Sequence, residues 1–313
     1  MRIQLIVVAF LAFVAKPAIG LQSPTRSNPP RKQGVIAQRL NLMSRRAPDF
    51  VRPATFKHPQ VHQVGGLRSS STDGEVLEDG GLDVDAIVKY GVALTTELGL
   101  FYGIFTGLDK LVAATNVKIP AAVNFIFFFG CALKSRILNP LLNKRPQPKN
   151  LEVEDIAPKR VMPSWTPPGV VFPIMWLLII GPIRAASSVM VYQTVGSYAN
   201  QAILSLMLHL SIGDVWNTIN NTERRYGVAV TGVVAVLCSK AFAAYQYYQV
   251  NQTAGKLLGA TCIWLTVATA LIAATWRLNP NPSTGKPEAL YPVKGSTTTK
   301  FLWFSGKHAD TTA

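Results

Sequence analysis

The sequence predicts an all-α membrane protein, namely a five-helix transmembrane bundle preceded by one additional helix, and three observations carry this prediction. The chain has 313 residues, of which 49% are hydrophobic and only 15% charged, and its mean hydropathy is +0.23. This composition is too apolar for an ordinary soluble domain. Several apolar stretches approach the roughly 20 residues that a helix needs to cross a bilayer. Prolines and clustered charges separate these stretches and mark the connections between helices.

Residues 1–72 have the composition of a targeting sequence. Arg2 is followed by a short apolar run and by small residues that end at Gly20, which is the pattern of a signal peptide over residues 1–20. Residues 21–72 are rich in Arg, Ser, Pro and Gln and nearly free of acids, which is typical of a transit peptide. The combination resembles the two-part presequences of algae with secondary plastids. We therefore expect a multi-pass protein of a plastid (chloroplast) membrane, with the endomembrane system as the alternative.

The net charge of +15 is concentrated in this leader. Residues 1–72 contain eleven Lys and Arg residues against one acid, whereas residues 73–313 contain twenty against fifteen. Most of the excess positive charge therefore belongs to a segment that import would remove. For this reason the charge does not indicate a nucleic-acid partner, and we expect membrane lipid to surround the mature chain.

Two segments precede the bundle. Residues 73–85 hold six acids among glycines, and we expect them to form a disordered leader. Residues 86–113 are mostly apolar and predict the additional helix. Glycines recur at a spacing of four from Gly99 to Gly107, which would let this helix approach a neighbour closely in lipid. Glu97, near the middle, leaves open whether the helix spans the bilayer or lies tilted at its interface.

The bundle itself covers residues 119–279, and a polar tail covers residues 280–313. We expect the five helices at 119–138, from the residue after Pro168 to about 193, at 198–221, at 226–249 and at 253–278. The twenty residues from 257 to 276 carry no formal charge, which makes the last helix the clearest span. The tail contains an aromatic cluster at 301–304, which would either anchor at the membrane interface or dock a partner.

Three sequence blocks resemble one family of membrane proteins. The first places a tryptophan suited to the membrane–water boundary before a pair of prolines that can only begin a helix. Its residues are Pro163, Trp165, Pro167, Pro168 and Trp176. The second block retains Leu210 and Trp216, with Gly213 in place of an asparagine. The third consists of Trp264, Ala268, Thr269, Leu271, Trp276, Arg277 and Asn279. In this order and spacing, the blocks resemble the TspO/MBR family of tryptophan-rich sensory proteins and translocator proteins.

The resemblance implies a pocket between the helices that binds a flat hydrophobic ligand, a porphyrin or other tetrapyrrole, for buffering, transport or stress signalling. Trp176 and Trp264 stand at family positions that line this pocket, and aromatic faces suit flat ligands. The other residues expected to contact the ligand are Trp216, Asp214, His209, Phe172 and Ala268. The alternative is that the bulky aromatic side chains only fill the core of the bundle.

Asp214 is the charged residue that most strongly indicates a site, because a carboxylate inside a membrane span is expensive and marks a functional position by default. Counting residues along the helices places Lys134 and Arg277 in the same half of the bilayer, as its partners. The same count places Arg184 near the opposite face, where its side chain would reach the headgroups. The alternative for Asp214 is a hydrogen bond that ties two helices together without a ligand.

His209 lies slightly more than one turn before Asp214 in the same predicted helix. An imidazole there would either ligate a metal ion or the magnesium of a pigment, or serve as a hydrogen-bonded packing residue. No second histidine lies in any predicted span, so we predict no metal site. The chain contains no CxxC motif, no phosphate-binding glycine loop and no nucleophile elbow.

These features favour a non-enzymatic binding protein. The alternative is a structural subunit or assembly factor of a plastid membrane complex, which would use the same fold without a free ligand pocket. In either case the expected protein partner is a second copy of the chain, in a homodimer, or a larger plastid membrane complex. A third reading is photo-oxidative porphyrin breakdown promoted by Trp176 and Trp264, for which the sequence offers no acid–base machinery.

Overall fold

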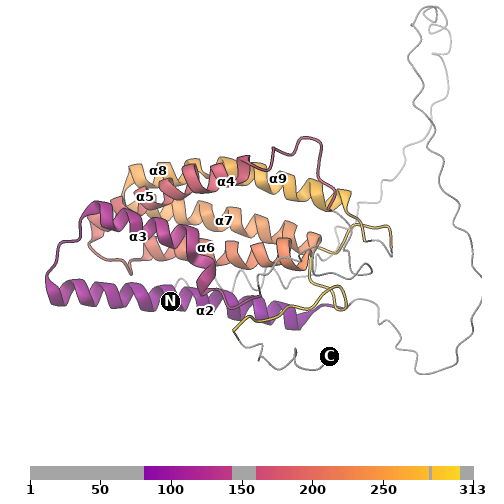
Figure 1. The fold of residues 1–313 in the computed structure, drawn as a ribbon, viewed down its shortest axis with the longest axis horizontal. Coiled ribbons are helices and arrows are strands. Elements are labelled where there is room, and N and C mark those ends of the chain that lie inside the picture. The colour runs from indigo at the N-terminus through magenta and orange to yellow at the C-terminus, as the bar shows by residue number, and fades with distance from the viewer. Residues whose placement is uncertain (1–80, 143–159, 282–283, 304–313) are drawn as a thin grey trace, which may run out of the picture. The chain divides into compact units, whose positions relative to one another are not determined.

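The computed structural model describes residues 81–142, 160–281 and 284–303. The predicted signal peptide and transit-peptide-like segment, most of the acidic leader and most of the linker before the proline pair lie outside these ranges. Over the described ranges the chain is helical and forms no β-strand (Figure 1). Six of its helical stretches are long and apolar enough to cross a membrane. The predicted fold class, an all-α membrane bundle with one additional N-terminal helix, is confirmed.

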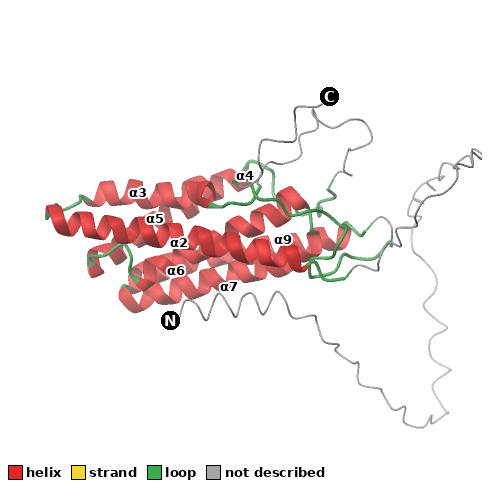
Figure 2. Ribbon diagram, turned by 90° about the horizontal axis from the view of Figure 1, so that it is seen from below, coloured by secondary structure: helices red, strands yellow, loops and turns green. Residues whose placement is uncertain are grey.

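Several of the membrane helices are built from consecutive segments, and Figure 2 shows them lying along one another. The additional helix is α2 (Val84–Thr115). The others are α3 (Ala121–Lys134) with the 3-10 turn η1 (Ser135–Leu138); α4 (Val171–Pro173) with the π-helical segment η4 (Ile174–Ile180) and α5 (Gly181–Val195); α6 (Gln201–Asn217) with the π-helical segment η5 (Thr218–Glu223); α7 (Tyr226–Val250); and α8 (Gln252–Ala260) with α9 (Cys262–Leu278).

The ends of α2 follow from the residues that flank it. The Asp83 side chain accepts a hydrogen bond from the backbone N–H of Ala86 at 3.0 Å and so caps the first turn. At the other end, Asn116 adopts a left-handed conformation with φ of 50°, which asparagine tolerates better than most residues and which terminates the helix. Both signals lie just outside the predicted range, and α2 is accordingly longer than 86–113 at each end.

The face that α2 turns toward α6 repeats every three to four residues. It includes Tyr90, Leu94, Glu97 and Phe101, all buried, whereas large apolar side chains on the other face are exposed, as a lipid-facing surface requires. The predicted close approach along the glycines from 99 to 107 is wrong. A Cβ atom built at any of these glycines would meet no other atom within 4 Å, because the row lies away from the packed face.

The most enclosed helix of the bundle is α6. In its most apolar window 83% of the residues are buried, against 17% in the span that contains α3 and 22% in the span that contains α9. It packs against α2 on one side and α7 on the other. Apolar residues of α6 point to all sides of the helix, which is typical of a helix in the core of a protein. The polar side chains that α6 carries are therefore held inside the bundle.

The loop before α4 is fixed to the end of α9. The Asn279 side chain accepts a hydrogen bond from the backbone N–H of Val161 at 2.8 Å and donates one to the Val161 carbonyl, also at 2.8 Å. Within the loop, the Pro163 carbonyl accepts hydrogen bonds from Thr166. Trp165 is 49% exposed, in keeping with a position at the membrane boundary. The first and third sequence blocks are therefore in contact in the folded chain.

The described C-terminal residues 284–303 return to the start of α2. Isolated β-bridges pair Leu82 with Val293 and Leu141 with Phe301. Phe301, the first residue of the predicted aromatic cluster, packs against the buried core that α2, α6 and α7 share. Trp303 remains 44% exposed, and the last residue of the cluster lies outside the described ranges. The tail is therefore anchored on the bundle itself through Phe301.

Candidate functional site

Trp176 lies in the π-helical segment η4, and the residues that follow it explain why this segment forms. Pro182 has no N–H to donate to the carbonyl four residues earlier, so the regular helical ladder cannot pass through it. The backbone N–H of Gly181 instead donates to the Trp176 carbonyl, five residues back. A Cβ atom at Gly181 would lie 2.9 Å from that carbonyl oxygen and 2.8 Å from the Phe129 ring, so only glycine fits. Such a bulge rotates every residue that follows it.

A cavity of about 300 Å³ lies inside the bundle next to this segment. Its walls come from α3 and η1, from η4 and α5, and from α6, α7 and α9. Most of the lining is apolar, and its polar members are Ser135, Arg136, Arg184, His209, Asp214 and Asn217. Apolar walls with a few converging polar groups are the usual composition of a ligand site, and the volume falls at the lower end of the range for such sites.

A second hollow, between α2 and α3, has a different character. It is about 370 Å³, and its lining is almost entirely apolar. Ile126 and Ile137, which line it, are 70% and 68% exposed. Surfaces of this kind face the acyl chains of lipid, so the cavity inside the bundle is the candidate site.

Five of the seven residues predicted to contact a ligand line this cavity: Trp176, Trp216, Asp214, His209 and Ala268. Phe172 and Trp264 do not. Their rings contact each other edge to face, with centroids 6.0 Å apart. Trp264 lies one turn before Ala268 on α9, and its indole packs on Phe172 instead of entering the cavity. No second tryptophan face opposes Trp176 from α9.

Asp214 is joined to α3 and to the additional helix. Its Oδ2 accepts a hydrogen bond from the Ser135 hydroxyl at 2.5 Å, and its carboxyl group lies beside that of Glu97. The predicted partners Lys134 and Arg277 are wrong, because both side chains are exposed. Counting residues gave their depth in the membrane but not the direction in which their side chains point.

Glu97 is fully buried and completes this polar wall. Its Oε2 accepts a hydrogen bond from the Asn139 amide at 2.8 Å. Its other oxygen, Oε1, has no hydrogen-bond partner among the described residues. The presence of an acid near the middle of an apolar helix was the signal that could have identified Glu97 as a site residue.

Arg184 also lies inside the bundle, and its predicted position near the headgroups is wrong. It is only 7% exposed, and at 1.5 Å per residue it lies about 16 Å from the end of its helix at Val195. Its guanidinium donates a hydrogen bond to Nε2 of His209 at 2.8 Å. The guanidinium carbon lies 5.3 Å from the centroid of the Trp176 ring, a cation–π contact.

Both ring nitrogens of His209 are engaged. Since Nε2 accepts from Arg184, Nδ1 carries the proton, and it lies 3.1 Å from the Val236 carbonyl and 3.1 Å from the Ser239 hydroxyl. Neither nitrogen is left to ligate a metal ion or a pigment. The described residues also contain no group of three His, Cys, Asp or Glu side chains placed to hold a metal. The geometry favours the hydrogen-bonded packing role for this histidine.

The family-motif residues outside the cavity fix the surrounding structure. The indole N–H of Trp276 donates to the Glu288 carbonyl at 2.9 Å and so attaches the C-terminal segment to α9. Pro163 is buried at the loop described above, and Arg277 is exposed. Pro167 and Pro168 immediately precede the helical turn at Val171. These residues shape the entry to the second bundle helix and do not line the cavity.

The fold and this cavity define a multi-pass helical membrane protein with a mostly apolar internal site. Comparison with known proteins agrees: the profile of the TspO/MBR family matches residues 136–277. The tryptophan-rich sensory protein of Cereibacter sphaeroides is 29% identical over 127 residues, which cover 41% of this chain and 76% of that protein. The human translocator protein is 29% identical over 123 residues, covering 37% and 70%. Protein CrtK of Rhodobacter capsulatus is 28% identical, covering 38% and 74%. Residues 136–277 of the chain therefore belong to the TspO/MBR family.

Proposed function

We propose that this protein binds a flat hydrophobic ligand, a tetrapyrrole, in the cavity inside its bundle and thereby serves in tetrapyrrole buffering, transport or stress signalling. The observation that carries the proposal is the cavity itself, with the indoles of Trp176 and Trp216 in its wall. Indole faces bind flat conjugated molecules by stacking and by apolar burial. Relatives named sensory protein and translocator protein support a role in binding or transport.

The size of the cavity limits the mode of binding. At about 300 Å³ it is smaller than a complete tetrapyrrole macrocycle. We expect one edge of the ring system to enter between η4 and α6, where the two indoles lie, with the rest of the ring between the helices. This arrangement needs no catalytic group. Photo-oxidative breakdown by a pair of tryptophans is disfavoured, since Trp264 does not line the cavity.

Quenching of tryptophan fluorescence tests the proposal. Full-length protein in detergent micelles is titrated with protoporphyrin IX, and the expected result is saturable quenching. Trp176→Phe and Trp216→Phe should each weaken the binding, because each removes an indole from the cavity wall. Linear, non-saturable quenching that is identical in both variants and wild type would show that the porphyrin only partitions into the micelle.

We expect the home of the protein to be a plastid membrane. The support is the composition of residues 1–72, a signal-peptide pattern followed by a basic, acid-poor segment. Fusing residues 1–72 to a fluorescent protein in an alga with secondary plastids tests this directly. Fluorescence in the plastid supports the assignment, and fluorescence confined to the secretory pathway supports the endomembrane alternative.

A structural subunit or assembly factor is the second candidate. It is favoured by the additional helix α2 and by the exposed side chains of Leu302 and Trp303, which are 39% and 44% accessible. Native electrophoresis of solubilised membranes distinguishes the two roles. Migration with a large complex, together with no porphyrin binding, would favour the subunit. Migration as a monomer or homodimer that binds porphyrin would favour the ligand carrier.

A further inference from the structure

Three basic side chains from three different helices meet beside the cavity. Arg184 of α5 and His209 of α6 line it, and Lys240 of α7 lies one helical turn after Val236, whose carbonyl is hydrogen-bonded to His209. All three are buried, with exposures of 7%, 1% and 0%. Among the described residues, the Lys240 ammonium and the Arg184 Nε have no hydrogen-bond partner.

Burying these basic side chains costs free energy unless an anion pairs with them. A buried cation without a partner loses its hydration and gains nothing in return. His209 is already engaged through both nitrogens and contributes no counter-charge. The nearby acid Asp214 is hydrogen-bonded to Ser135 instead. Among the described residues, no carboxyl group forms an ion pair with Arg184 or Lys240.

We propose that the basic cluster of Arg184, His209 and Lys240 receives a carboxylate of the ligand through Arg184, which the hydrogen bond to His209 holds in place. A guanidinium is the side chain best suited to bind a carboxylate through two parallel hydrogen bonds, and Arg184 lies on the cavity wall with its Nε unpaired. Lys240 does not line the cavity, and its buried nitrogen, which has no partner among the described residues, would hold a proton more readily once the carboxylate is bound. The contact between the guanidinium and the Trp176 ring places acid and aromatic recognition side by side.

The cluster narrows the class of ligand. It fits an amphipathic organic acid, a flat apolar body with a carboxylate at its edge, and it disfavours neutral sterols and cationic amines. This inference rests on the proposed function, because it assumes that the cavity is the binding site. It adds that the acidic edge of the ligand is the part that enters first and that the neutral form of the same ligand binds weakly.

Two probes that differ only in charge test the inference: protoporphyrin IX, which carries two carboxylates, and its dimethyl ester, which carries none. Binding to full-length protein in detergent is measured by tryptophan quenching. Since hydrogen bonds to charged groups are worth more than neutral ones, we expect the free acid to bind about ten- to a hundredfold more tightly than the ester. Arg184→Gln and Lys240→Met should each reduce this preference for the free acid severalfold.

The same titration includes two control variants. Lys256→Met removes an exposed cation from α8 and should leave both affinities as in wild type, and Arg184→Lys should retain part of the preference. Ester binding by a variant shows that it is folded, and the wild-type comparison decides the question even if a variant misfolds. Equal affinities for acid and ester overturn the carboxylate site and leave the ligand cavity standing. Failure of both probes to bind overturns the proposed function and this inference with it.

Discussion

The carboxyl groups of Glu97, from the additional helix, and Asp214, from α6, lie side by side inside the bundle, and Asp214 lies in the wall of the cavity. The family match begins at residue 136, so Glu97 comes from outside the region that the relatives share. Through this contact α2 becomes part of the polar wall of the candidate site. The additional helix is therefore more than a peripheral membrane anchor. Removing the Glu97 carboxyl group should change both the stability of the fold and the surroundings of Asp214.

We predict that Glu97→Ala lowers the free energy of unfolding by about 2–3 kcal/mol, because it leaves the buried Asn139 amide without its hydrogen-bond partner. Glu97→Gln should cost less, since its amide oxygen can still accept from Asn139. Thermal or denaturant unfolding in detergent, followed by circular dichroism, measures the difference. Asp85→Ala is the matched control, because that side chain is 66% exposed. Equal stability of the Glu97 and Asp85 alanine variants would contradict the buried contact between Glu97 and Asn139.

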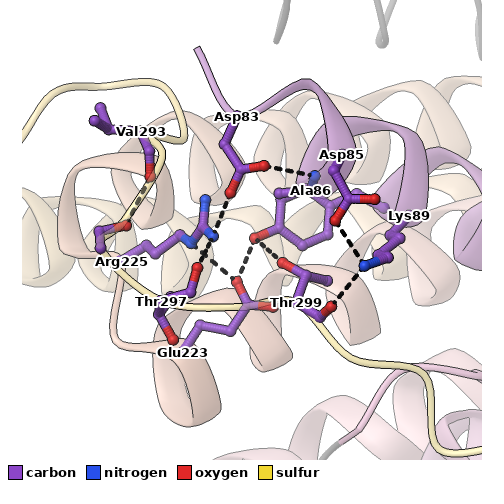
Figure 3. A network of polar contacts seen from close by, with 11 residues as sticks. Asp83, Asp85, Ala86, Lys89, Glu223, Arg225, Val293, Thr297 and Thr299 are labelled. Atoms are coloured by element: carbon purple, nitrogen blue, oxygen red, sulfur yellow. Dashed lines mark hydrogen bonds and ion pairs between the residues drawn. The ribbon is translucent and has the colours of Figure 1, made fainter. Parts of the chain in front are cut away.

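Arg225 joins the start of α2 to the C-terminal segment, as Figure 3 shows. It is 3% exposed and donates to Asp83 Oδ2 at 2.7 Å and to the Thr297 carbonyl at 2.6 Å, and it forms an ion pair with Glu223 at 3.4 Å. Breaking a buried ion pair by removing one partner is strongly destabilising. We predict that Arg225→Met costs about 3 kcal/mol and speeds proteolysis between residues 284 and 303. Lys294→Met, at an exposed position in that segment, should leave the cleavage rate unchanged.

The same contact predicts a response to acid. Burial alone would raise the pKa of Asp83, but hydrogen bonds from Arg225 and from the Ala86 backbone outweigh it, and the pKa lies below its ordinary value of 3.8. A group whose pKa is lowered by folding contributes stability that is present above its unfolded-state pKa and is lost as the pH falls through the folded-state value. We therefore expect this contribution to persist at neutral pH and to disappear below about pH 4. Comparing wild type with Asp83→Asn across this range tests it, and a gap in stability that does not narrow on acidification would contradict it.

From the sequence, the positions of the helices and the types of residue at the site could be predicted better than the way in which those residues are arranged. The apolar runs and the proline pair located every membrane helix, and the cost of a carboxylate in lipid identified Asp214. Arg184 was misplaced because counting residues gives a position along the helix but not the direction of the side chain, and the π-helical segment at 174–180 changes that direction for the residues that follow it. The position of Glu97 beside Asp214 depends on how α2 is rotated about its own axis, and only packing against α6 determines that.

The tryptophans should differ in their response to ligand. Trp176 and Trp216 line the cavity, whereas Trp264 packs on Phe172. We predict that Trp176→Phe and Trp216→Phe each weaken protoporphyrin binding about fivefold or more, which corresponds to the roughly 1 kcal/mol expected for one aromatic contact. Trp264→Phe should leave the affinity unchanged and so serves as the control. A Trp264 variant that binds as weakly as the Trp176 variant would place the ligand nearer to α9 than we propose.

Gly232 of α7 sets the position of the Trp216 indole. The indole N–H donates to the Ala229 carbonyl at 2.9 Å, which holds the ring against α7, and a Cβ atom at Gly232 would lie 2.8 Å from Cδ1 of that ring. Gly232→Ala must therefore push the ring away from α7 and alter the cavity wall. We predict a loss of stability of about 1–3 kcal/mol from overpacking together with weaker quenching by protoporphyrin IX. Gly259→Ala, whose new methyl group would meet its nearest neighbour at 3.8 Å, is the control expected to change neither property. If Gly232→Ala binds the porphyrin as wild type does, the ligand does not depend on the Trp216 face, and Trp176 alone would have to provide the stacking surface.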